Sequence, residues 1–253
     1  MGLYKMTMLI KDVSYSFING DKQRNQVLSG LNLTVNQGEF VSMIGRSGTG
    51  KSTILKLITG LLTPEEGAIT IHGKPIALGD VGYMPQRDLL LPWRTIIDNI
   101  MIAGEVQKGL TITQEKARSW LERVGLLEYE HALPKQLSGG MRQRAAFLRA
   151  LLTGKDILLL DEPFGALDAL TKKEMQTWLL SIWQELDQTI LFITHDLEEA
   201  IFMSDRIVLL APNAALEEVA VDLPRPRTRE IQHSTELFML RQELEKKIAY
   251  DNN

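Results

Sequence analysis

The sequence predicts an α/β fold: a mixed sheet core with an N-terminal antiparallel β part and an inserted α-helical subdomain. Two continuous apolar runs, Asp156 to Leu160 and Thr189 to Ile193, suit central parallel strands that are covered on both faces. Between them, apolar residues from Met175 to Leu186 recur at helical spacing, and Asp168 is placed to cap that helix. A helix between two such strands indicates a right-handed crossover in a parallel sheet.

The first elements follow the same logic. Met1 to Phe17 is predicted to be a strand rather than a signal peptide, because charged residues interrupt its apolar positions. Alternation of apolar and polar residues from Leu31 to Val35 predicts a half-buried strand, and Glu39 to Ile44 predicts another. Helical spacing begins at Lys51, and Gly60 is expected near the end of that helix, since glycine disfavours a helix interior by roughly 1 kcal/mol.

The stretch from Arg87 to Thr153 interrupts the alternation and predicts helix after helix, one of them capped by Thr113. Two prolines in Leu223 to Arg229 exclude a regular helix there, and apolar residues from Leu237 to Ile248 predict a C-terminal amphipathic helix that covers the core. We therefore expect a discontinuous α/β core at residues 1–86 and 154–215, a helical subdomain at 87–153, and a C-terminal extended segment and helix at 216–253.

Composition excludes several classes of protein. The formal net charge of −4 argues against a non-specific nucleic-acid binder, which carries a basic surplus. The chain has no cysteine, which excludes disulfides and thiolate metal sites. No run approaches the ~18–20 apolar residues that cross a bilayer. Any work at a membrane would therefore go through another protein.

A phosphate-binding loop is the strongest local signal. Gly45 to Ser52 matches the pattern G-x-x-x-x-G-K-[ST] between a predicted strand and a predicted helix. The glycines let main-chain N–H groups surround phosphate oxygens, Lys51 would reach the β- and γ-phosphates, and the Ser52 hydroxyl would ligate Mg²⁺. The residues expected to contact ATP here are Gly45, Arg46, Ser47, Gly48, Thr49, Gly50, Lys51, Ser52 and Thr53.

Further motifs identify a family. Leu137 to Met141 reads Leu-Ser-Gly-Gly-Met at the start of a predicted helix, Asp161 and Glu162 follow an apolar strand, and His195 follows the next one. With the glutamine at Gln86 and the Ala-Leu-Asp run ending at Asp168, this order resembles that of the ATP-binding-cassette (ABC) ATPases, over nearly the whole chain. The resemblance implies the P-loop NTPase (RecA-like) fold, with ATP and Mg²⁺ as cofactors. Met141 departs from the more familiar glutamine at that signature position.

The resemblance implies a role for each motif. Two cassettes would face head to tail, so that Ser138, Gly139 and Gly140 of one act on the nucleotide held by the other. Glu162 would activate the attacking water and His195 would stabilise the γ-phosphate, with Gln86 and Lys51 completing the catalytic set. Mg²⁺ would be bound by Ser52, Gln86 and Asp161. Phe17 would stack on adenine.

Several assignments have structural alternatives. Phe17 could be core packing, and Tyr15 is a rival for the adenine. Asp168 could act across the pair of cassettes or simply cap its helix. Trp93 could anchor a membrane partner or be buried in the helical insertion. Arg225, Arg227 and Arg229 are expected to form a solvated linker, with an anion or partner site as the alternative.

The segment Leu91 to Trp93, the signature run and the later Leu-Pro-Arg-Pro-Arg are together similar to the nitrate, taurine, sulfonate and bicarbonate importer branch, which also takes up vitamin precursors. This resemblance implies a permease in the membrane, a second cassette as homodimer partner, an extracytoplasmic substrate-binding protein, and no nucleic-acid partner. The chain would lie at the cytoplasmic face of the membrane as a peripheral subunit. The alternatives are an exporter cassette and a non-transport cassette of DNA repair or translation.

Overall fold

The computed structural model describes residues 6–18, 20, 23–46, 48–107, 109–186, 188–211 and 215–250. The strands in these ranges are β1 (Met6–Ile18), β2 (Arg24–Asn36), β3 (Phe40–Gly45), β4 (Glu66–Ile71), β5 (Lys74–Pro75), β6 (Gly82–Met84), β7 (Ile157–Asp161), β8 (Thr189–Ile193), β9 (Arg206–Leu210) and β10 (Leu216–Ala220). The α-helices are α1 (Lys51–Ile58), α2 (Ile96–Val106), α3 (Gln114–Arg123), α4 (Gly139–Leu151), α5 (Ala169–Leu186), α6 (Leu197–Met203) and α7 (Thr235–Tyr250). Short 3₁₀ turns occupy Leu127–Tyr129, Pro134–Gln136 and Arg229–His233.

The main sheet has the strand order β10-β9-β3-β8-β7-β6. Every neighbouring pair from β9 to β6 is parallel, and β10 joins the edge antiparallel to β9. Alternate residues of the central strands face opposite hydrophobic clusters: Leu158 and Leu160 pack with α4 and α5, whereas Ile157 and Leu159 pack with α1. Burial on both faces explains why these strands read as continuous apolar runs.

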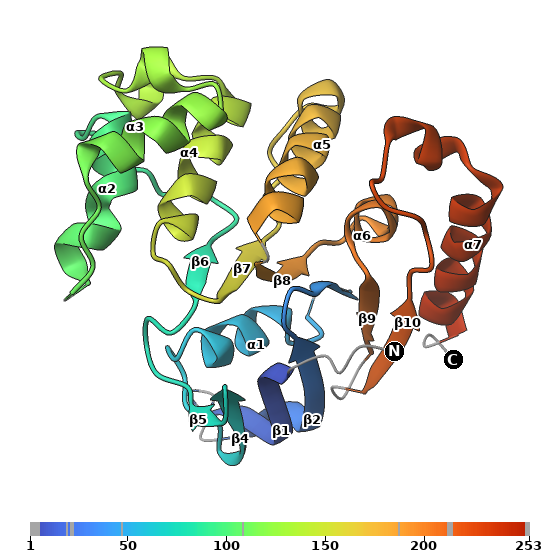
Figure 1. Cartoon of the computed structure of the whole chain (residues 1–253). Coiled ribbons are helices and arrows are strands. Elements are labelled where there is room, and N and C mark those ends of the chain that lie inside the picture. The colour runs from blue at the N-terminus through green and yellow to red at the C-terminus, as the bar shows by residue number, and fades with distance from the viewer. Residues whose placement is uncertain are drawn as a thin grey trace.

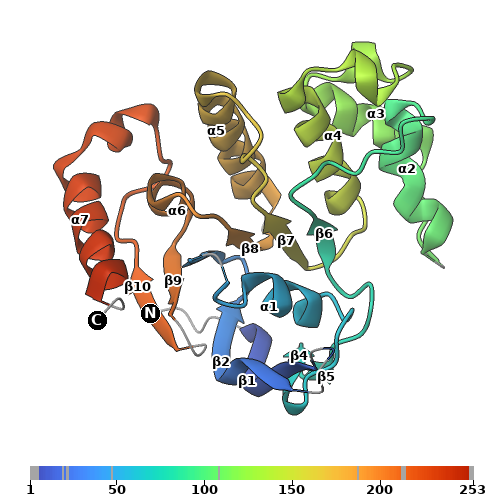
Figure 2. The ribbon, with the colours of Figure 1, turned by 180° about the vertical axis from the view of Figure 1, so that it is seen from behind.

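A smaller antiparallel sheet, in the order β2-β1-β4-β5, packs against α1 on the face of the main sheet opposite α5 (Figures 1 and 2). The buried residues Met8, Ile10 and Val13 of β1 share a cluster with Ile54 and Leu57 of α1. The expected fold class, a mixed α/β sheet with an N-terminal antiparallel part and inserted helices, is confirmed.

Most predicted elements are confirmed within a residue or two. The helix from Lys51 ends at Ile58, before Gly60 at φ +73°. Thr113 caps α3 by accepting from the amide of Lys116, and Asp168 caps α5 by accepting from the amides of Leu170 and Thr171. The predicted N-terminal strand is present as β1, while its first five residues lie outside the described ranges. The sequence did not predict the strands β4, β5, β6, β9 and β10 or the helix α6.

The helices α2, α3 and α4 lie between β6 and β7 in the chain and gather at one end of the molecule (Figure 1). Within the described residues of 87–153 there is no strand, as expected. Trp93, in the loop before α2, is 73% exposed, so burial inside the helical insertion is wrong. No helix in the described ranges has the length and apolar composition that a bilayer crossing requires. The proposed domain boundaries themselves stay a prediction.

The C-terminal segment differs from its expected character. Arg227 is only 4% exposed, so the expectation of a solvated arginine linker is wrong at this position. Arg225 is partly buried, and Arg229 alone of the three is exposed. Beyond it, α7 buries Leu237 and Leu244 against α6 and β9, which confirms that the helix covers the domain's own core.

A matched pair of glycines gives a test of the small sheet. Gly67 and Gly73 both have φ +76°, but a Cβ at Gly67 would lie 2.3 Å from the main-chain oxygen of Lys11, whereas nothing lies within 4 Å of one at Gly73. We expect Gly73→Ala to cost about 1 kcal/mol for its left-handed conformation. Gly67→Ala should cost about 1–3 kcal/mol more, because β1 and β4 must separate. Urea unfolding of both variants measures the difference, and equal losses would contradict the close approach.

Candidate functional site

The parallel strands bring their carboxyl ends to one edge of the main sheet. β3 continues into the glycine-rich loop, β7 ends at Asp161 and is followed by Glu162, and β8 is followed by Thr194 and His195. Because β3, β8 and β7 are neighbours in the sheet, these loops lie beside one another. Ligands in such sheets bind outside the carboxyl ends of the strands.

The glycine-rich loop has the conformation that its sequence predicts. Gly48 and Gly50 have φ of +87° and +100°, values that favour glycine, and Gly50 caps the start of α1. The Lys51 Nζ lies over the loop and donates to the main-chain oxygens of Gly45, at 2.5 Å, and Arg46, at 2.8 Å. Ser47, expected to contact nucleotide, lies outside the described residues.

A cavity of about 790 Å³ opens on this loop. It brings most of the predicted loop residues together with both catalytic candidates that follow β7 and β8: its lining includes Gly45, Arg46, Gly48, Gly50, Lys51, Ser52, Thr53, Glu162 and His195. Apolar residues form the rest of its walls: Val27, Ile44, Leu197, Leu209, Leu210, Ala211 and Ile248. The cavity thus combines a phosphate-binding loop with a carboxylate and an imidazole.

Glu162 is the centre of the polar contacts at this cavity. Its Oε2 accepts a hydrogen bond from Gln86 Nε2 at 2.9 Å and lies 3.4 Å from His195 Nδ1. Its backbone has φ +43°, a conformation that is uncommon for a residue with a side chain and that clusters at active sites. Residues that are distant in sequence therefore converge on one carboxylate.

Asp161 is half-buried at the end of β7. Burial, followed by repulsion from Glu162, raises the pKa of Asp161 above its ordinary value, although Lys51 and Tyr83 oppose the shift. The Tyr83 hydroxyl lies 3.4 Å from Asp161 Oδ2, and burial together with that carboxylate raises the pKa of Tyr83 to about 12. Burial also lowers the pKa of Lys51, against the opposing attraction of the two carboxylates. Because Asp161 and Glu162 repel each other, a cation beside the two carboxylates would stabilise their ionised forms.

The residues present fit Mg²⁺. A hydroxyl on Ser52 and the carboxylate of Asp161 are oxygen donors, the type that Mg²⁺ prefers, and Mg²⁺ usually takes one or two protein carboxylates with phosphate oxygens and water. No cluster of three or more His, Asp or Glu suited to a metal occurs among the described residues. Phosphate oxygens of a nucleotide and water would supply the remaining ligands of such a cation. Gln86 turns its amide nitrogen to Glu162, so its oxygen is the atom that could reach a cation.

The Leu-Ser-Gly-Gly segment opens a helix, as predicted, but away from the cavity of its own chain. The Ser138 hydroxyl accepts from the amide of Met141 and caps α4, and Gly139 and Gly140 form the first turn. A Cβ at Gly140 would come within 2.6 Å of Thr171 on α5. None of these three residues lines the glycine-loop cavity, which fits a role toward a second molecule. The role of Asp168 across such a pair stays a prediction.

Phe17 and Tyr15 lie together on β1, with ring centroids 5.1 Å apart in an edge-on arrangement. Phe17 is 38% exposed, so simple burial in the core does not account for it. Neither ring lines the glycine-loop cavity, and the choice between them for adenine stays a prediction.

The sequence did not predict a charged cluster beside His195, which is formed by Lys172, Asp196 and Glu199. Lys172 Nζ lies 2.8 Å from Asp196 Oδ2 and 2.5 Å from an oxygen of Glu199, which is 5% exposed. The Thr194 hydroxyl donates to the other oxygen of Glu199 and accepts from the amide of Asp196. The cluster ties α5 to both residues that flank His195. Its sequence signal is weak, because Lys172 lies 24 residues before Asp196.

Comparison with known proteins gives consistent matches. Residues 28–165 match the family model described as ABC transporter. The chain is 40% identical over 247 residues to the formylaminopyrimidine import ATP-binding protein of Halalkalibacterium halodurans, covering 97% of this chain and 96% of that one. It is 46% identical over 208 residues to the nitrate import ATP-binding protein of Synechococcus elongatus, covering 79% and 76%. A dimeric ATP-binding cassette, solved in a post-hydrolysis state with ADP and phosphate, superposes with a TM-score of 0.74 at 29% identity, covering 86% of this chain and all of that one.

The charged cluster predicts a pH-dependent loss of stability. Lys172→Met leaves Glu199 without its cation, and we expect unfolding free energy at pH 7 to fall by about 2 kcal/mol, less than for a fully buried pair because Lys172 is partly exposed. Burial alone would raise the pKa of Asp196, but hydrogen bonds from Lys172 and the Glu199 amide outweigh burial and hold that pKa below its ordinary value.

The lowered pKa of Asp196 determines how the free energy of unfolding changes with pH. The folded state binds fewer protons than the unfolded state as Asp196 titrates, so the cluster's contribution is present above the ordinary carboxyl range and is lost as the pH falls through the lowered pKa. Urea unfolding from pH 3 to 8 should therefore show the gap between wild type and Lys172→Met closing at acid pH. Lys173→Met, at the exposed neighbouring position, should behave as wild type. A gap that is constant with pH would contradict the ion cluster.

Proposed function

The chain belongs to the ABC transporter family, and from that premise we propose that it works as one of a pair of identical cassettes that drive the import of a small anion or a vitamin precursor. The family and its relatives make it the ATP-hydrolysing subunit of an importer. The observation that carries the hydrolytic assignment is the convergence of Gln86 and His195 on Glu162, beside the phosphate loop. The exporter and non-transport alternatives are disfavoured, because the relatives are named as import proteins.

In this proposal the loop binds the triphosphate before any chemistry. The amides at Gly48 to Ser52 and the positive end of α1 would face the phosphate oxygens. The Lys51 Nζ would leave the carbonyls of Gly45 and Arg46 for the β- and γ-phosphates, which offer it charged acceptors. Mg²⁺, held by Ser52 and Asp161 with phosphate oxygens, would neutralise charge on the phosphates.

Hydrolysis would centre on Glu162. Its carboxylate would accept a hydrogen bond from the attacking water and orient the water in line with the γ-phosphate, with the Gln86 amide fixing the carboxylate. His195 would donate to the γ-phosphate oxygens as charge spreads over them in the transition state. The unusual backbone at Glu162 supports this assignment, since strained conformations are retained where function needs them.

A second cassette would complete the site. Ser138, Gly139 and Gly140 stand at the start of α4 with main-chain amides that suit an anion, yet they do not line their own chain's cavity. A head-to-tail pair would bring them to the partner's γ-phosphate. The dimeric form of a cassette at 29% identity supports such a pair.

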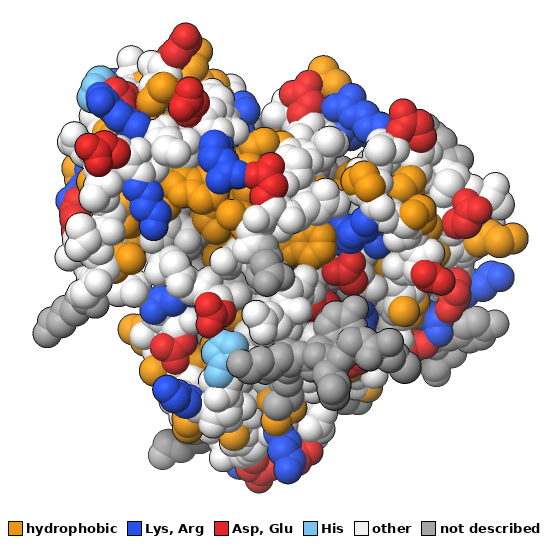
Figure 3. Space-filling view, viewed as in Figure 1, with side chains coloured by type: hydrophobic (Ala, Val, Ile, Leu, Met, Phe, Trp, Pro, Cys, Tyr) orange, Lys and Arg blue, Asp and Glu red, His pale blue; other side chains and the backbone are white. Residues whose placement is uncertain are grey.

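A membrane permease would dock beside Gln86. A second hollow, of about 670 Å³, is lined by Gln86 to Leu90, by the start of α4 and by the Gly165 to Leu167 loop. Hydrophobic side chains gather on the surface between α4 and α5 (Figure 3). Leu89 lines this hollow and is 59% exposed. Trp93 follows the lining residue Leu90 by three positions and is 73% exposed, and aromatic residues are typical interface anchors. A helix end of the permease in this hollow would press on the residue that contacts Glu162.

The transported molecule and its delivery are inferred from the names of the relatives. The names of the relatives include the import of formylaminopyrimidine, nitrate and aliphatic sulfonates and the transport of bicarbonate, and we extend that chemical range to taurine. A substrate-binding protein outside the membrane would deliver the cargo to the permease, and the cassette would remain peripheral at the cytoplasmic face.

The hydrolytic assignment predicts a separation of binding from turnover. Glu162→Gln should reduce the turnover of ATP by about a hundredfold or more, because the base is lost. Its affinity for ATP should stay within about twofold, since the phosphate loop is intact. Lys51→Ala should instead lose affinity. Phosphate release and equilibrium binding of a fluorescent ATP analogue measure the two quantities, with the exposed Glu128→Gln as control. Normal turnover by Glu162→Gln would refute the assignment.

The partner assignment is tested with the same variant. Tagged Glu162→Gln, trapped with ATP and Mg²⁺, is used to capture proteins from detergent-solubilised native membranes, which are identified by mass spectrometry. We expect a polytopic membrane protein, and Trp93→Ala should reduce its recovery because the anchor is removed. Recovery of soluble proteins or nucleic acid alone would overturn the transport assignment.

A further inference from the structure

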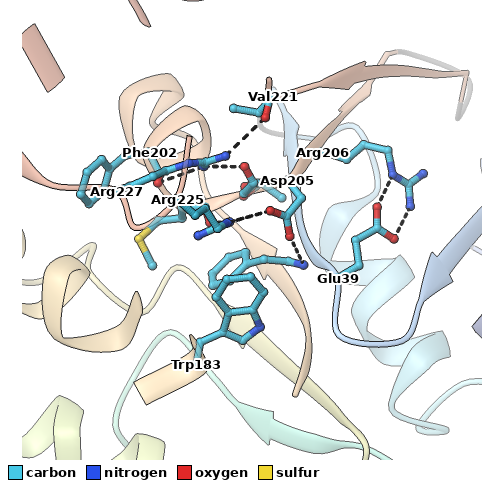
Figure 4. Close-up of polar contacts among 12 residues, drawn as sticks. Glu39, Trp183, Phe202, Asp205, Arg206, Val221, Arg225 and Arg227 are labelled. Atoms are coloured by element: carbon cyan, nitrogen blue, oxygen red, sulfur yellow. Dashed lines mark hydrogen bonds and ion pairs between the residues drawn. The ribbon is translucent and has the colours of Figure 1, made fainter. Parts of the chain in front are cut away.

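Helix α6 begins directly after His195 and Asp196 and has only seven residues, so both of its ends matter for the position of the imidazole. The carbonyls of the last turn of a helix have no partner within the helix. Here the guanidinium of Arg227 fills that role: its Nη1 lies 2.9 Å from the carbonyl oxygen of Ile201, 3.1 Å from that of Phe202 and 2.5 Å from that of Ser204 (Figure 4).

Arg225 binds a further carbonyl at the C-terminal end of α6. Its Nη2 donates to the carbonyl oxygen of Met203 at 2.9 Å, and its Nε donates to Asp205 Oδ1 at 2.9 Å. The guanidinium also stacks over the ring of Trp183 on α5, 4.3 Å from the centroid. Asp205 in turn accepts from the amide of Phe40 at the start of β3. The two arginines thus join the end of α6 to α5 and to the strand that leads to the phosphate loop.

The chemistry of these contacts suits arginine in particular. The negative end of a helix dipole stabilises a cation, and the planar guanidinium presents several donors in a fixed fork, whereas lysine is a point charge. Arg227 is 4% exposed, and its burial, together with repulsion from Arg225, lowers the pKa of Arg227 to about 10. The side chain is therefore still a cation at neutral pH.

A seven-residue helix is about 10 Å long, or two turns, so its last turn lies directly against its first. Its first turn is fixed by the Asp196 carboxylate, which accepts from the amides of Glu198 and Glu199. A displacement of the last turn of α6 would therefore change the position of His195. We propose that Arg225 and Arg227 are positioning residues for ATP hydrolysis, which hold the C-terminal end of α6 and through it the imidazole of His195 beside Glu162. This inference rests on the role of His195 in the proposed function.

The first test separates positioning from nucleotide binding. Arg227→Met and Arg227→Lys should lower kcat by about tenfold to a hundredfold, the scale of a misplacement of about 1 Å at a catalytic group. KM for ATP should be unchanged, since neither arginine contacts the phosphate loop. Arg227→Lys should retain more activity than Arg227→Met, because it keeps the charge but loses the fork. Arg229→Met, at the exposed position of the same segment, should match wild type. An equal loss in kcat and in ATP affinity would overturn the inference.

The second test asks whether the effect passes through His195. In a His195→Ala background, Arg227→Met should cause no further loss of kcat, because the group that it positions is absent. The same fold-loss in both backgrounds would overturn the inference. Arg225→Gln and Arg227→Lys, checked by thermal unfolding, serve in the same cycle if Arg227→Met does not fold. The role of His195 in hydrolysis and the positioning role of the arginines are refuted by different results. Wild-type turnover by His195→Ala would refute the proposed function. Impaired turnover by His195→Ala, with arginine effects that add to it, would refute only the positioning.

Discussion

Everything at the functional edge depends on the order of the parallel strands. Because β3 lies between β9 and β8, and β8 is followed by β7 and β6, the loops after four strands open on the same side of the sheet. The phosphate loop, Glu162, His195 and Gln86 come from chain segments separated by tens of residues, and only this order brings them into contact distance. The sheet can hold that order rigidly because both of its faces are covered by apolar side chains.

The part of the structure that could be predicted from sequence is the part with local patterns. The phosphate loop has a fixed spacing in which glycine, lysine and serine each have a separate chemical reason, and the central strands have long apolar runs. By contrast, β5 has two residues and β6 has three, which is too short for any periodicity. The family resemblance supplied the roles of Ser138 to Gly140 and of His195, which no local pattern in the residues could have assigned.

The arginines of the C-terminal segment were misread for a different reason. Alternating proline and arginine has the composition of a solvated linker. Nothing in the sequence of the segment indicates which hydrogen-bond acceptors its arginines contact. The acceptors of Arg227 on α6 are main-chain carbonyls 23 to 26 residues earlier, and a carbonyl is present at every position of every sequence. Contacts to the main chain therefore leave no side-chain signature. The cap that Ser138 gives to α4 is also a contact to the main chain. Its donor, the amide of Met141, lies only three residues later, so a serine before a predicted helix is enough to predict that contact.

The insertion of α2, α3 and α4 between β6 and β7 has an evolutionary consequence. These two strands are neighbours in the sheet and pair in parallel register from Gly82 to Met84, so the helices form part of the crossover that carries the chain from the carboxyl end of β6 back to the amino end of β7. A change in the length or composition of a crossover leaves the strand order untouched. Exposed positions on α2 and α3 can thus change without altering the strand order or the loops at the carboxyl ends of the strands, whereas the start of α4, which carries Ser138 to Gly140, does not have that freedom.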